Sequence, residues 1–276
     1  MPKKLKYPLI ISDFDGTLVN DDGTISQENK NAIAKYVQDG GVFAISTGRM
    51  HYGILPRARE LGLKGVISCC QGALIMDIET QNILQDGTFS NEKTVEICEV
   101  MEELGLHIHL YAFDDYYVNM DDEALKNYER AVRRKGKLVL DKPLSKYAKE
   151  KQLCAYKLLA MVPPNETGEV IQSLKERNMQ GCIVTKSAPF LVEVINEKYS
   201  KGTAVDFLAK HYGVAIENTI GIGDQWNDVP MIEAAGLGIA VKNADEQLKK
   251  CAVIVDYTNE ESAVGRIIEK YGYQYD

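Results

Sequence analysis

The sequence has no long hydrophobic run. No apolar stretch in its 276 residues approaches the roughly 18 that a helix needs to cross a bilayer, which excludes membrane-embedded proteins such as ion pumps. The basic start at residues 1–6 leads into an apolar run, residues 8–11, that is too short for the apolar region of a signal peptide. We therefore expect a cytoplasmic protein with no membrane partner.

Cysteine and histidine metal motifs are missing as well. The six cysteines include no C-x-x-C pair and five lie in or beside apolar segments, so we expect buried thiols instead of disulfides or a zinc site. The four histidines include no H-x-x-x-H pair, which argues against a histidine-ligated metal.

Excess positive charge is also absent. The net charge of −8 argues against binding to nucleic acid, and the basic cluster at residues 130–137 has the spacing of a solvated helix face.

What the sequence does contain is a repeated alternation of apolar runs and helical patterns. The runs are uninterrupted, which is typical of strands covered on both faces, as in a parallel sheet. They are residues 8–12, 42–46, 66–70, 219–223, 238–241 and 253–256. A helix is expected from Ser26, a plausible N-cap, to Gly40.

Between these two blocks the pattern changes. Several strands in residues 83–196 alternate apolar with polar residues, which indicates an antiparallel sheet with one solvated face. We therefore predict a Rossmann-like doubly wound parallel sheet core, formed by residues 1–82 and 197–276. An α/β domain with an antiparallel sheet is inserted into it at residues 83–196.

Acidic side chains follow the first predicted strand. The segment Asp13-Phe14-Asp15-Gly16-Thr17 places two carboxylates at its carboxyl end, where open α/β sheets bind ligands. With a third carboxylate they can hold Mg²⁺ in oxygen coordination. The structural alternative is a turn that merely uses Asp and Gly.

Two further segments stand at the ends of later strands. Ser46-Thr47-Gly48-Arg49 offers a hydroxyl and backbone N–H groups for a phosphoryl oxygen, although a Ser/Thr N-cap explains it equally well. The segment at residues 221–228 adds Asp224 and Asp228, and crowded carboxylates need a cation or a proton. Alternatively, Asn227 or Asp228 only caps the helix begun by Pro230.

Lys201 stands where the inserted domain returns to the core and a helix begins. An isolated lysine is usually a surface charge. Here it is the only cation that the sequence places to neutralise a transferred phosphoryl group.

Taken together, the four segments resemble the haloacid dehalogenase-like hydrolase superfamily. The large insertion after the third strand is similar to that of its Cof-type, class IIB phosphatases, and residues 230–236 match the usual continuation after the acidic motif. The resemblance implies a phosphatase whose inserted domain is a cap. In two places the chain departs from the common pattern: Gln71 replaces an asparagine before Gly72-Ala73, and Gln225-Trp226 replaces small or polar residues.

The resemblance also implies roles for single residues. Asp13 is the nucleophile that becomes an aspartyl phosphate, and Asp15 is the general acid and base. Thr47 binds the phosphoryl group with backbone N–H groups near Gly16 and Gly48, while Lys201 offsets its charge. The implied ligands of Mg²⁺ are the Asp13 carboxylate, the Asp15 main-chain carbonyl and Asp224, with Asp228 as a further ligand or as a support for the others. Asn227 contacts phosphate or water.

The expected partner is a small phosphorylated metabolite, such as a sugar phosphate, a phosphorylated cofactor or a nucleotide. Candidate contacts from the cap are Tyr111, Asp114, Lys186 and Ser187, each of which can equally be a surface or sheet residue. A phosphosugar mutase of the same superfamily and a non-catalytic phosphate-binding module remain as alternatives.

Overall fold

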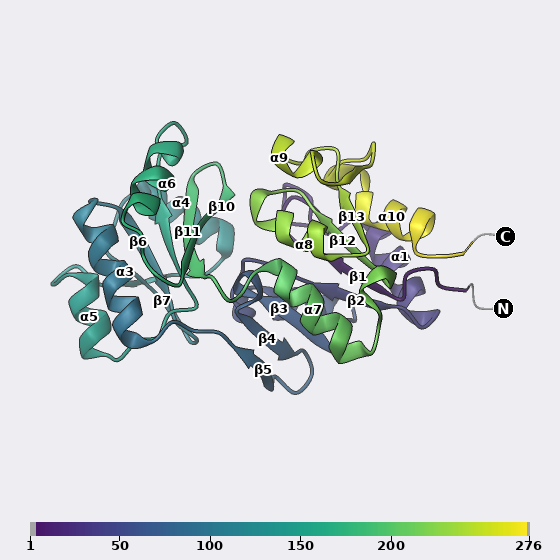
Figure 1. Ribbon diagram of the computed structural model, residues 1–276, viewed down its shortest axis with the longest axis horizontal. Helices are drawn as coiled ribbons and strands as arrows, with labels where there is room; N and C mark the ends of the chain where they lie inside the picture. Colours follow the sequence, from purple (N-terminus) through teal and green to yellow (C-terminus); the bar gives the residue numbers. More distant parts are fainter. Residues whose placement is uncertain (1–3, 275–276) are drawn as a thin grey trace. The chain divides into compact units, whose positions relative to one another are not determined.

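The computed structural model describes residues 4–274 (Figure 1), and these residues form two compact units. Unit 1 comprises the chain up to Arg49, Ile54–Gln85, and the chain from Tyr199 onward. Unit 2 comprises Met50–Gly53 and Asp86–Lys198. Each unit is described by itself below.

Unit 1 is built around a five-stranded parallel sheet in the order β14-β13-β12-β1-β2. Its strands are β1 (Leu9–Ser12), β2 (Val42–Ile45), β12 (Thr219–Gly223), β13 (Leu237–Ala240) and β14 (Val253–Ile254). Every residue of β1 is fully buried, because helices cover both faces of the sheet.

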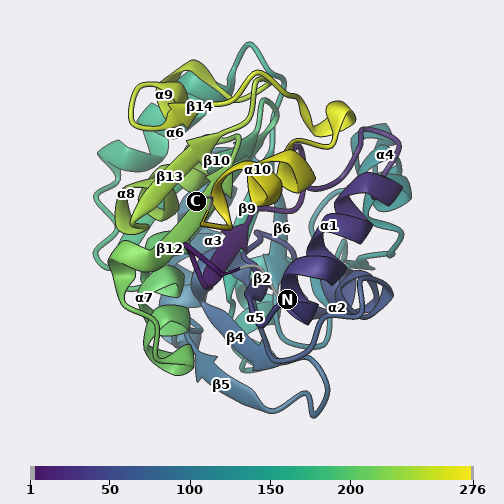
Figure 2. The ribbon, with the colours of Figure 1, turned by 90° about the vertical axis from the view of Figure 1, so that its right-hand side faces the viewer.

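The helices of unit 1 lie in two layers (Figure 2). Helix α1 (Gln27–Gln38) packs with α10 (Ala263–Tyr271) on one face, and α7 (Lys201–Tyr212) packs with α8 (Val229–Ala234) on the other. Two further helices are α2 (His51–Glu60), which begins in unit 2, and α9 (Glu246–Lys249). Ser26 caps α1 by accepting a hydrogen bond from the N–H of Asn29, as predicted. The predicted doubly wound core is confirmed.

The third predicted strand is the exception. β3 (Val66–Cys69) is linked to the parallel sheet by an isolated parallel bridge between Ser68 and Ser46, the residue that follows β2. Its full partner is β4 (Leu74–Asp77), which runs antiparallel to it in a three-stranded sheet with β5 (Ile83–Asp86). The expectation that residues 66–70 form a regular strand of the parallel sheet was therefore wrong. The run is continuously apolar because both of its faces are buried, and burial does not reveal the direction of the partner strand.

Unit 2 holds a six-stranded sheet in the order β10-β11-β9-β6-β7-β8. Its strands are β6 (His107–Tyr111), β7 (Tyr116–Val118), β8 (Lys137–Leu138), β9 (Lys157–Met161), β10 (Cys182–Ala188) and β11 (Leu191–Asn196). All pairs are antiparallel except β7 with β8, which confirms the predicted antiparallel sheet and adds a short parallel edge.

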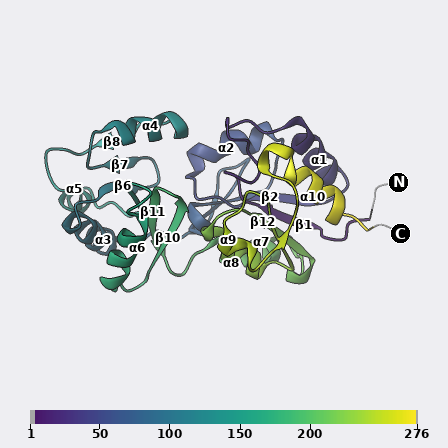
Figure 3. The ribbon, with the colours of Figure 1, turned by 90° about the horizontal axis from the view of Figure 1, so that it is seen from above.

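Four helices accompany this sheet: α3 (Asn91–Glu103), α4 (Glu123–Val132), α5 (Leu144–Glu150) and α6 (Thr167–Glu176). Figure 3 shows α4 on one side of the sheet, with α3 and α6 on the other. The core of unit 2 lies on the second side, where Ile108, Leu110 and Leu158 are fully buried.

The cysteines only partly match the expectation of buried thiols. All six are free, and Cys69, Cys70 and Cys98 are buried. Cys154 and Cys251 are exposed, and Cys182 is half-buried, because apolar neighbours in sequence do not by themselves place a side chain on the inner face of its element.

Among the described helices, none combines the length and the hydrophobicity that crossing a bilayer requires.

Candidate active site

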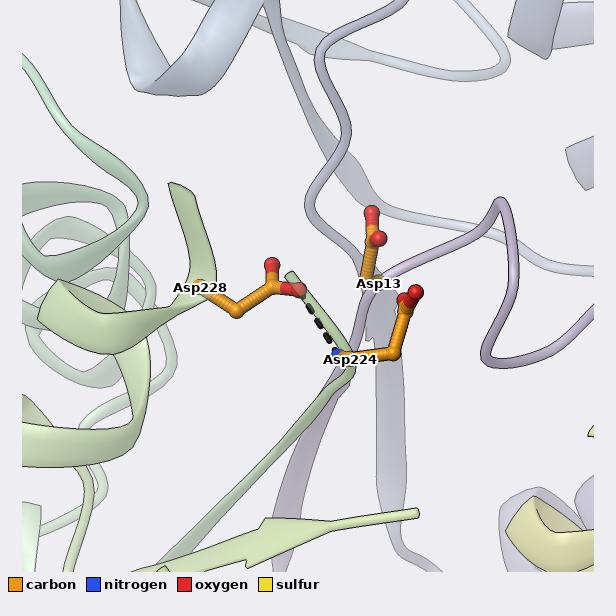
Figure 4. Close-up of side chains that lie close together, drawn as sticks. All are labelled: Asp13, Asp224 and Asp228. Atoms are coloured by element: carbon orange, nitrogen blue, oxygen red, sulfur yellow. Dashed lines mark hydrogen bonds between the residues drawn. The ribbon is translucent and has the colours of Figure 1, made fainter. Parts of the chain in front are cut away.

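Three carboxylates meet at the carboxyl end of the unit 1 sheet (Figure 4). Asp13 directly follows β1, Asp224 follows the neighbouring β12, and Asp228 ends a 3₁₀ turn, Trp226–Asp228, that precedes α8. One oxygen from each carboxylate lies within 4.8 Å of the others, and all three residues are buried. Adjacent parallel strands bring these residues together although more than 200 positions separate Asp13 from Asp224 in the chain.

Lys201 lies inside this cluster. Its Nζ is 2.6 Å from Asp13 Oδ1 and 2.5 Å from Asp228 Oδ1, and its side chain is completely buried. Lys201 is the first residue of α7, and Ser200 caps that helix through a capping box with Thr203. The cap fixes the start of the helix, so the lysine enters the site from a defined point.

The cluster is short of positive charge. When all three carboxylates are ionised, one ammonium leaves a net charge of −2 in a buried space. Burial, followed by the charge of Asp228, raises the pKa of Asp13 well above its usual value, although Lys201 opposes this. The same two causes raise the pKa of Asp224 to about 7. Burial alone lowers the pKa of Lys201, but the charges of Asp13 and Asp228 outweigh it and the pKa is raised.

Backbone donors hold Asp228 in place. Its Oδ2 accepts hydrogen bonds of 2.9 Å from the N–H groups of both Asp224 and Gln225. Its side chain does not cap α8, so the interpretation of Asp228 as no more than a helix cap is wrong. The carboxylate instead faces the cluster, where two backbone N–H groups and Lys201 contact it.

The loop after β1 closes against Asp224. Thr17, which is fully buried, donates from Oγ1 to Asp224 Oδ1 over 2.7 Å. Gly16 has a φ of +74°, and a Cβ at this position would lie 2.5 Å from Asp224 Oδ2. Only glycine fits both the backbone conformation and the close approach.

Thr47 and Gly48 follow β2, which is the other neighbour of β1. Thr47 is buried, and its Oγ1 accepts a 3.2 Å hydrogen bond from the N–H of Arg49. A Cβ on Gly48 would lie 2.6 Å from Gln71 Nε2. Gln71 Oε1 in turn accepts a 3.0 Å bond from Asn227 Nδ2, so this glutamine links the loop after β2 to the acidic segment.

Asp15 is the predicted site residue whose carboxylate stands outside the cluster. Its two oxygens accept hydrogen bonds of 2.6 Å each from Nε and Nη2 of Arg49. Arg49 is thus a second cation beside the site, which corrects the expectation that Lys201 is the only one. The arginine lies within the Ser46–Arg49 segment, but nothing in that pattern names its partner.

One residue beside the site, Asn243, lies in a segment that the sequence analysis does not single out. Asn243 donates from Nδ2 to the carbonyl of Gly16 over 2.8 Å, from a segment far along the chain. Thr17 and Gln71, in contrast, stand inside segments that the sequence does single out.

The four cap candidates lie in unit 2, and two of them serve local structure. Tyr111 is buried, stacks on Tyr116 with ring centroids 5.0 Å apart, and hydrogen-bonds to Tyr128. Ser187 donates to Glu193, which forms a buried ion pair with Lys157. Asp114 is exposed and Lys186 is half-buried.

Comparison with known proteins then identifies the family. A family model described as haloacid dehalogenase-like hydrolase matches residues 10–268. The chain belongs to this family. A putative phosphatase of Haemophilus influenzae is 30% identical to this hydrolase, covering 96% of the chain and 98% of the relative. Phosphatase YwpJ of Bacillus subtilis is 28% identical over 95% of the chain and 98% of its own length, and pyridoxal phosphate phosphatase YbhA of Escherichia coli is 25% identical over 94% and 97%.

Solved structures agree with the family assignment. A haloacid dehalogenase-like hydrolase from B. subtilis superposes with a TM-score of 0.85, with 25% identity over 95% of this chain and 99% of that one. A HAD subclass IIB sugar phosphatase superposes with a TM-score of 0.81 over 95% and 97%, and at 21% identity it supports the fold alone. The predicted membership of the haloacid dehalogenase-like hydrolase superfamily is confirmed.

Proposed function

We propose that this hydrolase removes the phosphoryl group from a small phosphorylated metabolite, with Mg²⁺ bound, through an aspartyl phosphate on Asp13. The observation that carries the proposal is the position of Asp13. It follows the buried strand β1, its Oδ1 lies 2.6 Å from Lys201 Nζ, and two further carboxylates stand beside it. This arrangement combines a nucleophilic oxygen with charges that can fix both a cation and a phosphoryl group.

The chain's own residues fit a divalent metal. Three buried carboxylates within 4.8 Å supply the hard oxygen donors that Mg²⁺ prefers. Burial, followed by the charge of Asp228, raises the pKa of both Asp13 and Asp224, and a bound cation would offset this. Asp13, Asp224 and the main-chain carbonyl of Asp15 would hold the ion, with Asp228 as a fourth ligand or as a support for Lys201 and the Asp224 N–H. When bound, Mg²⁺ neutralises charge that develops on the phosphoryl oxygens.

The reaction divides into two displacements at phosphorus. In the first, an Asp13 oxygen forms a bond to phosphorus while the bond to the ester oxygen breaks, and Asp15 gives its proton to the departing alkoxide. In the second, Asp15 takes a proton from water, the water oxygen bonds to phosphorus, and the acyl phosphate bond breaks to return the Asp13 carboxylate. The products are an alcohol and inorganic phosphate.

The phosphoryl oxygens need donors, and the loops after β1 and β2 offer them. Lys201 supplies an ammonium, Thr47 a hydroxyl, and the backbone N–H groups near Gly16 and Gly48 supply further donors. Asn227 adds an acceptor, because its Oδ1 is buried and has no hydrogen-bond partner among the described residues. That atom suits a water or a hydroxyl better than it suits a phosphoryl oxygen.

We further propose that residues 83–196 act as a cap domain that contacts the leaving group, and that residues 1–82 and 197–276 form the catalytic domain. The proposed substrates are sugar phosphates and phosphorylated cofactors. One relative is named a pyridoxal phosphate phosphatase and one structural neighbour a sugar phosphatase. A cytoplasmic location is part of the proposal, since six free cysteines suit a reducing compartment.

The proposal predicts that Asp13→Asn abolishes Mg²⁺-dependent phosphate release from p-nitrophenyl phosphate. An amide oxygen is a far weaker nucleophile than a carboxylate, so we expect a loss of at least about 10³-fold in kcat. The measurement is phosphate release with excess Mg²⁺, with the far-ultraviolet circular dichroism spectrum as the control for folding. Turnover close to wild type in the folded variant would remove Asp13 from its role. With a sugar phosphate as the substrate of the wild-type protein, an isomerised phosphosugar without phosphate release would point to a mutase instead.

A further inference from the structure

The guanidinium of Arg49 grips the carboxylate of Asp15 at both oxygens. Nε donates to Oδ2 and Nη2 donates to Oδ1, each over 2.6 Å. This fork-to-fork geometry fixes the plane and the direction of the carboxylate, which a single hydrogen bond does not do. Asp15 therefore has a defined orientation although its side chain is 53% exposed.

Arg49 is itself firmly placed. Its backbone N–H donates to Thr47 Oγ1 over 3.2 Å, and its carbonyl accepts a 3.0 Å hydrogen bond from the N–H of Cys70. Its guanidinium carbon lies 5.2 Å from the ring centroid of Phe14, which is almost completely buried. The arginine thus connects the loop after β1, which carries Asp15, to the loop after β2, which carries Thr47.

Stability alone does not explain where this pair lies. Exposed ion pairs typically add about 1 kcal/mol or less to the free energy of unfolding, and bidentate arginine–carboxylate pairs are the kind that can add more. Many other surface pairs of the chain need only one contact, such as Lys30 with Glu60 or Arg266 with Glu28. The Arg49 pair differs because its carboxylate belongs to the segment that also carries Asp13.

We propose that Arg49 is a positioning residue for catalysis, which fixes the direction of the Asp15 side chain. In its protonated form Asp15 gives its proton to the leaving group in the first displacement, and as a carboxylate it takes a proton from the attacking water in the second. The inference rests on the proposed function, in which Asp15 is the acid. Arg49 acts through Asp15 and makes no bond to the reacting atoms. Replacing the arginine should therefore slow the first displacement when the leaving group must be protonated. The rate should change little when the leaving group departs readily as an anion.

The test compares p-nitrophenyl phosphate with phenyl phosphate, which has nearly the same shape but a more basic leaving group. We expect Arg49→Met to lower kcat/KM for phenyl phosphate roughly 10-fold or more and for p-nitrophenyl phosphate less than about threefold, because proton transfer contributes mainly to the first. Asp15→Asn should show the same selectivity more strongly. Arg49→Lys should recover only part of the loss, since an ammonium cannot form the fork.

A double-mutant cycle separates positioning from direct binding. If Arg49 acts through Asp15, Arg49→Met has little further effect in the Asp15→Asn background. Two results would contradict the inference, because both would mean that Arg49 binds the phosphoryl group itself. In one, the losses of kcat/KM in the two single variants multiply in the double variant. In the other, Arg49→Met lowers kcat/KM equally for both esters. The matched control is Arg266→Met, which removes another arginine that lies over an aromatic ring and beside a carboxylate, with no expected effect on either ester.

Failure of the proposed function gives a different result. A wild-type protein that hydrolyses neither ester, or an Asp15→Asn variant without leaving-group selectivity, contradicts the assignment of Asp15 before Arg49 is considered. A selective Asp15→Asn variant beside an unselective Arg49→Met variant contradicts the positioning role alone.

Discussion

At the residue scale, ionisation of Asp224 lowers the stability of the metal-free folded protein. Its pKa of about 7 lies above the value of about 3.9 for an aspartate in the unfolded chain. Below about pH 4 the carboxyl group is protonated in both the folded and the unfolded state, so its ionisation does not change the free energy of unfolding. As the pH rises toward 7, the unfolded chain loses the proton first, and the folded state becomes relatively less stable.

We therefore predict that Asp224→Asn stabilises the metal-free protein at about pH 8 and has little effect at about pH 4. The amide keeps an oxygen for the hydroxyl of Thr17 and carries no charge beside Asp228, so the expected gain is about 1–3 kcal/mol in the free energy of unfolding. Urea unfolding in EDTA at the two pH values measures it. The control is Asp206→Asn, which removes the same charge from an exposed position of α7. An equal gain in both variants would assign the effect to net charge.

At the element scale, the turn between β3 and β4 supports the start of α7. Cys70, Gln71 and Gly72 all have positive φ values, of 50°, 59° and 94°. A Cβ on Gly72 would lie 2.3 Å from the carbonyl oxygen of Ser200, the residue that caps α7 just before Lys201. The strained turn and Lys201, the lysine proposed to bind the phosphoryl group, thus depend on one close contact between backbones.

Gly72→Ala should consequently harm both folding and catalysis. We expect a loss of about 2–4 kcal/mol in the free energy of unfolding, from the left-handed backbone together with the clash, and a lower kcat because Ser200 must move. Gly62→Ala is the matched control. Gly62 also has a positive φ, of 67°, but no atom lies within 4 Å of its added Cβ, so it should lose only about 1 kcal/mol and keep its activity. Equal losses in the two variants would show that the contact with Ser200 does not matter.

Elements were predictable from the sequence where burial leaves a clear pattern. The strands of the parallel sheet are continuously apolar, and their ends agree with the structure to within a few residues. β5 was missed because its residues are mostly exposed, and α5 because seven residues after a proline give too little periodicity. The segments that carry the carboxylates were visible, since each follows a strand. The fork between Arg49 and Asp15 was not, because the choice of a side-chain partner 34 residues away depends on the folded loops.

At the scale of the whole molecule, the residues proposed to carry the reaction at phosphorus lie in one unit. Asp13, Asp224, Asp228 and Lys201 all belong to unit 1, and no other group of potential metal ligands occurs among residues 4–274. Unit 2 has its own sheet and its own hydrophobic core. A metal ion held by these three carboxylates is therefore bound by side chains of unit 1.

Binding of Mg²⁺ should accordingly slow hydrogen exchange of backbone amides in unit 1, with its largest effect at the ends of β1 and β12 and in residues 224–228. The stabilisation follows from binding to the folded state alone, and it should weaken below about pH 7 because protons compete for Asp224. Exchange measured with and without Mg²⁺, at about pH 8 and about pH 6, tests both points, and Na⁺ at equal ionic strength is the control. Protection that begins in the core strands of unit 2, such as β6 and β9, would mean that the metal acts elsewhere. Asp224→Asn should remove the protection in unit 1 while the exchange rates of β6 and β9 stay unchanged, since those strands owe their stability to a separate core.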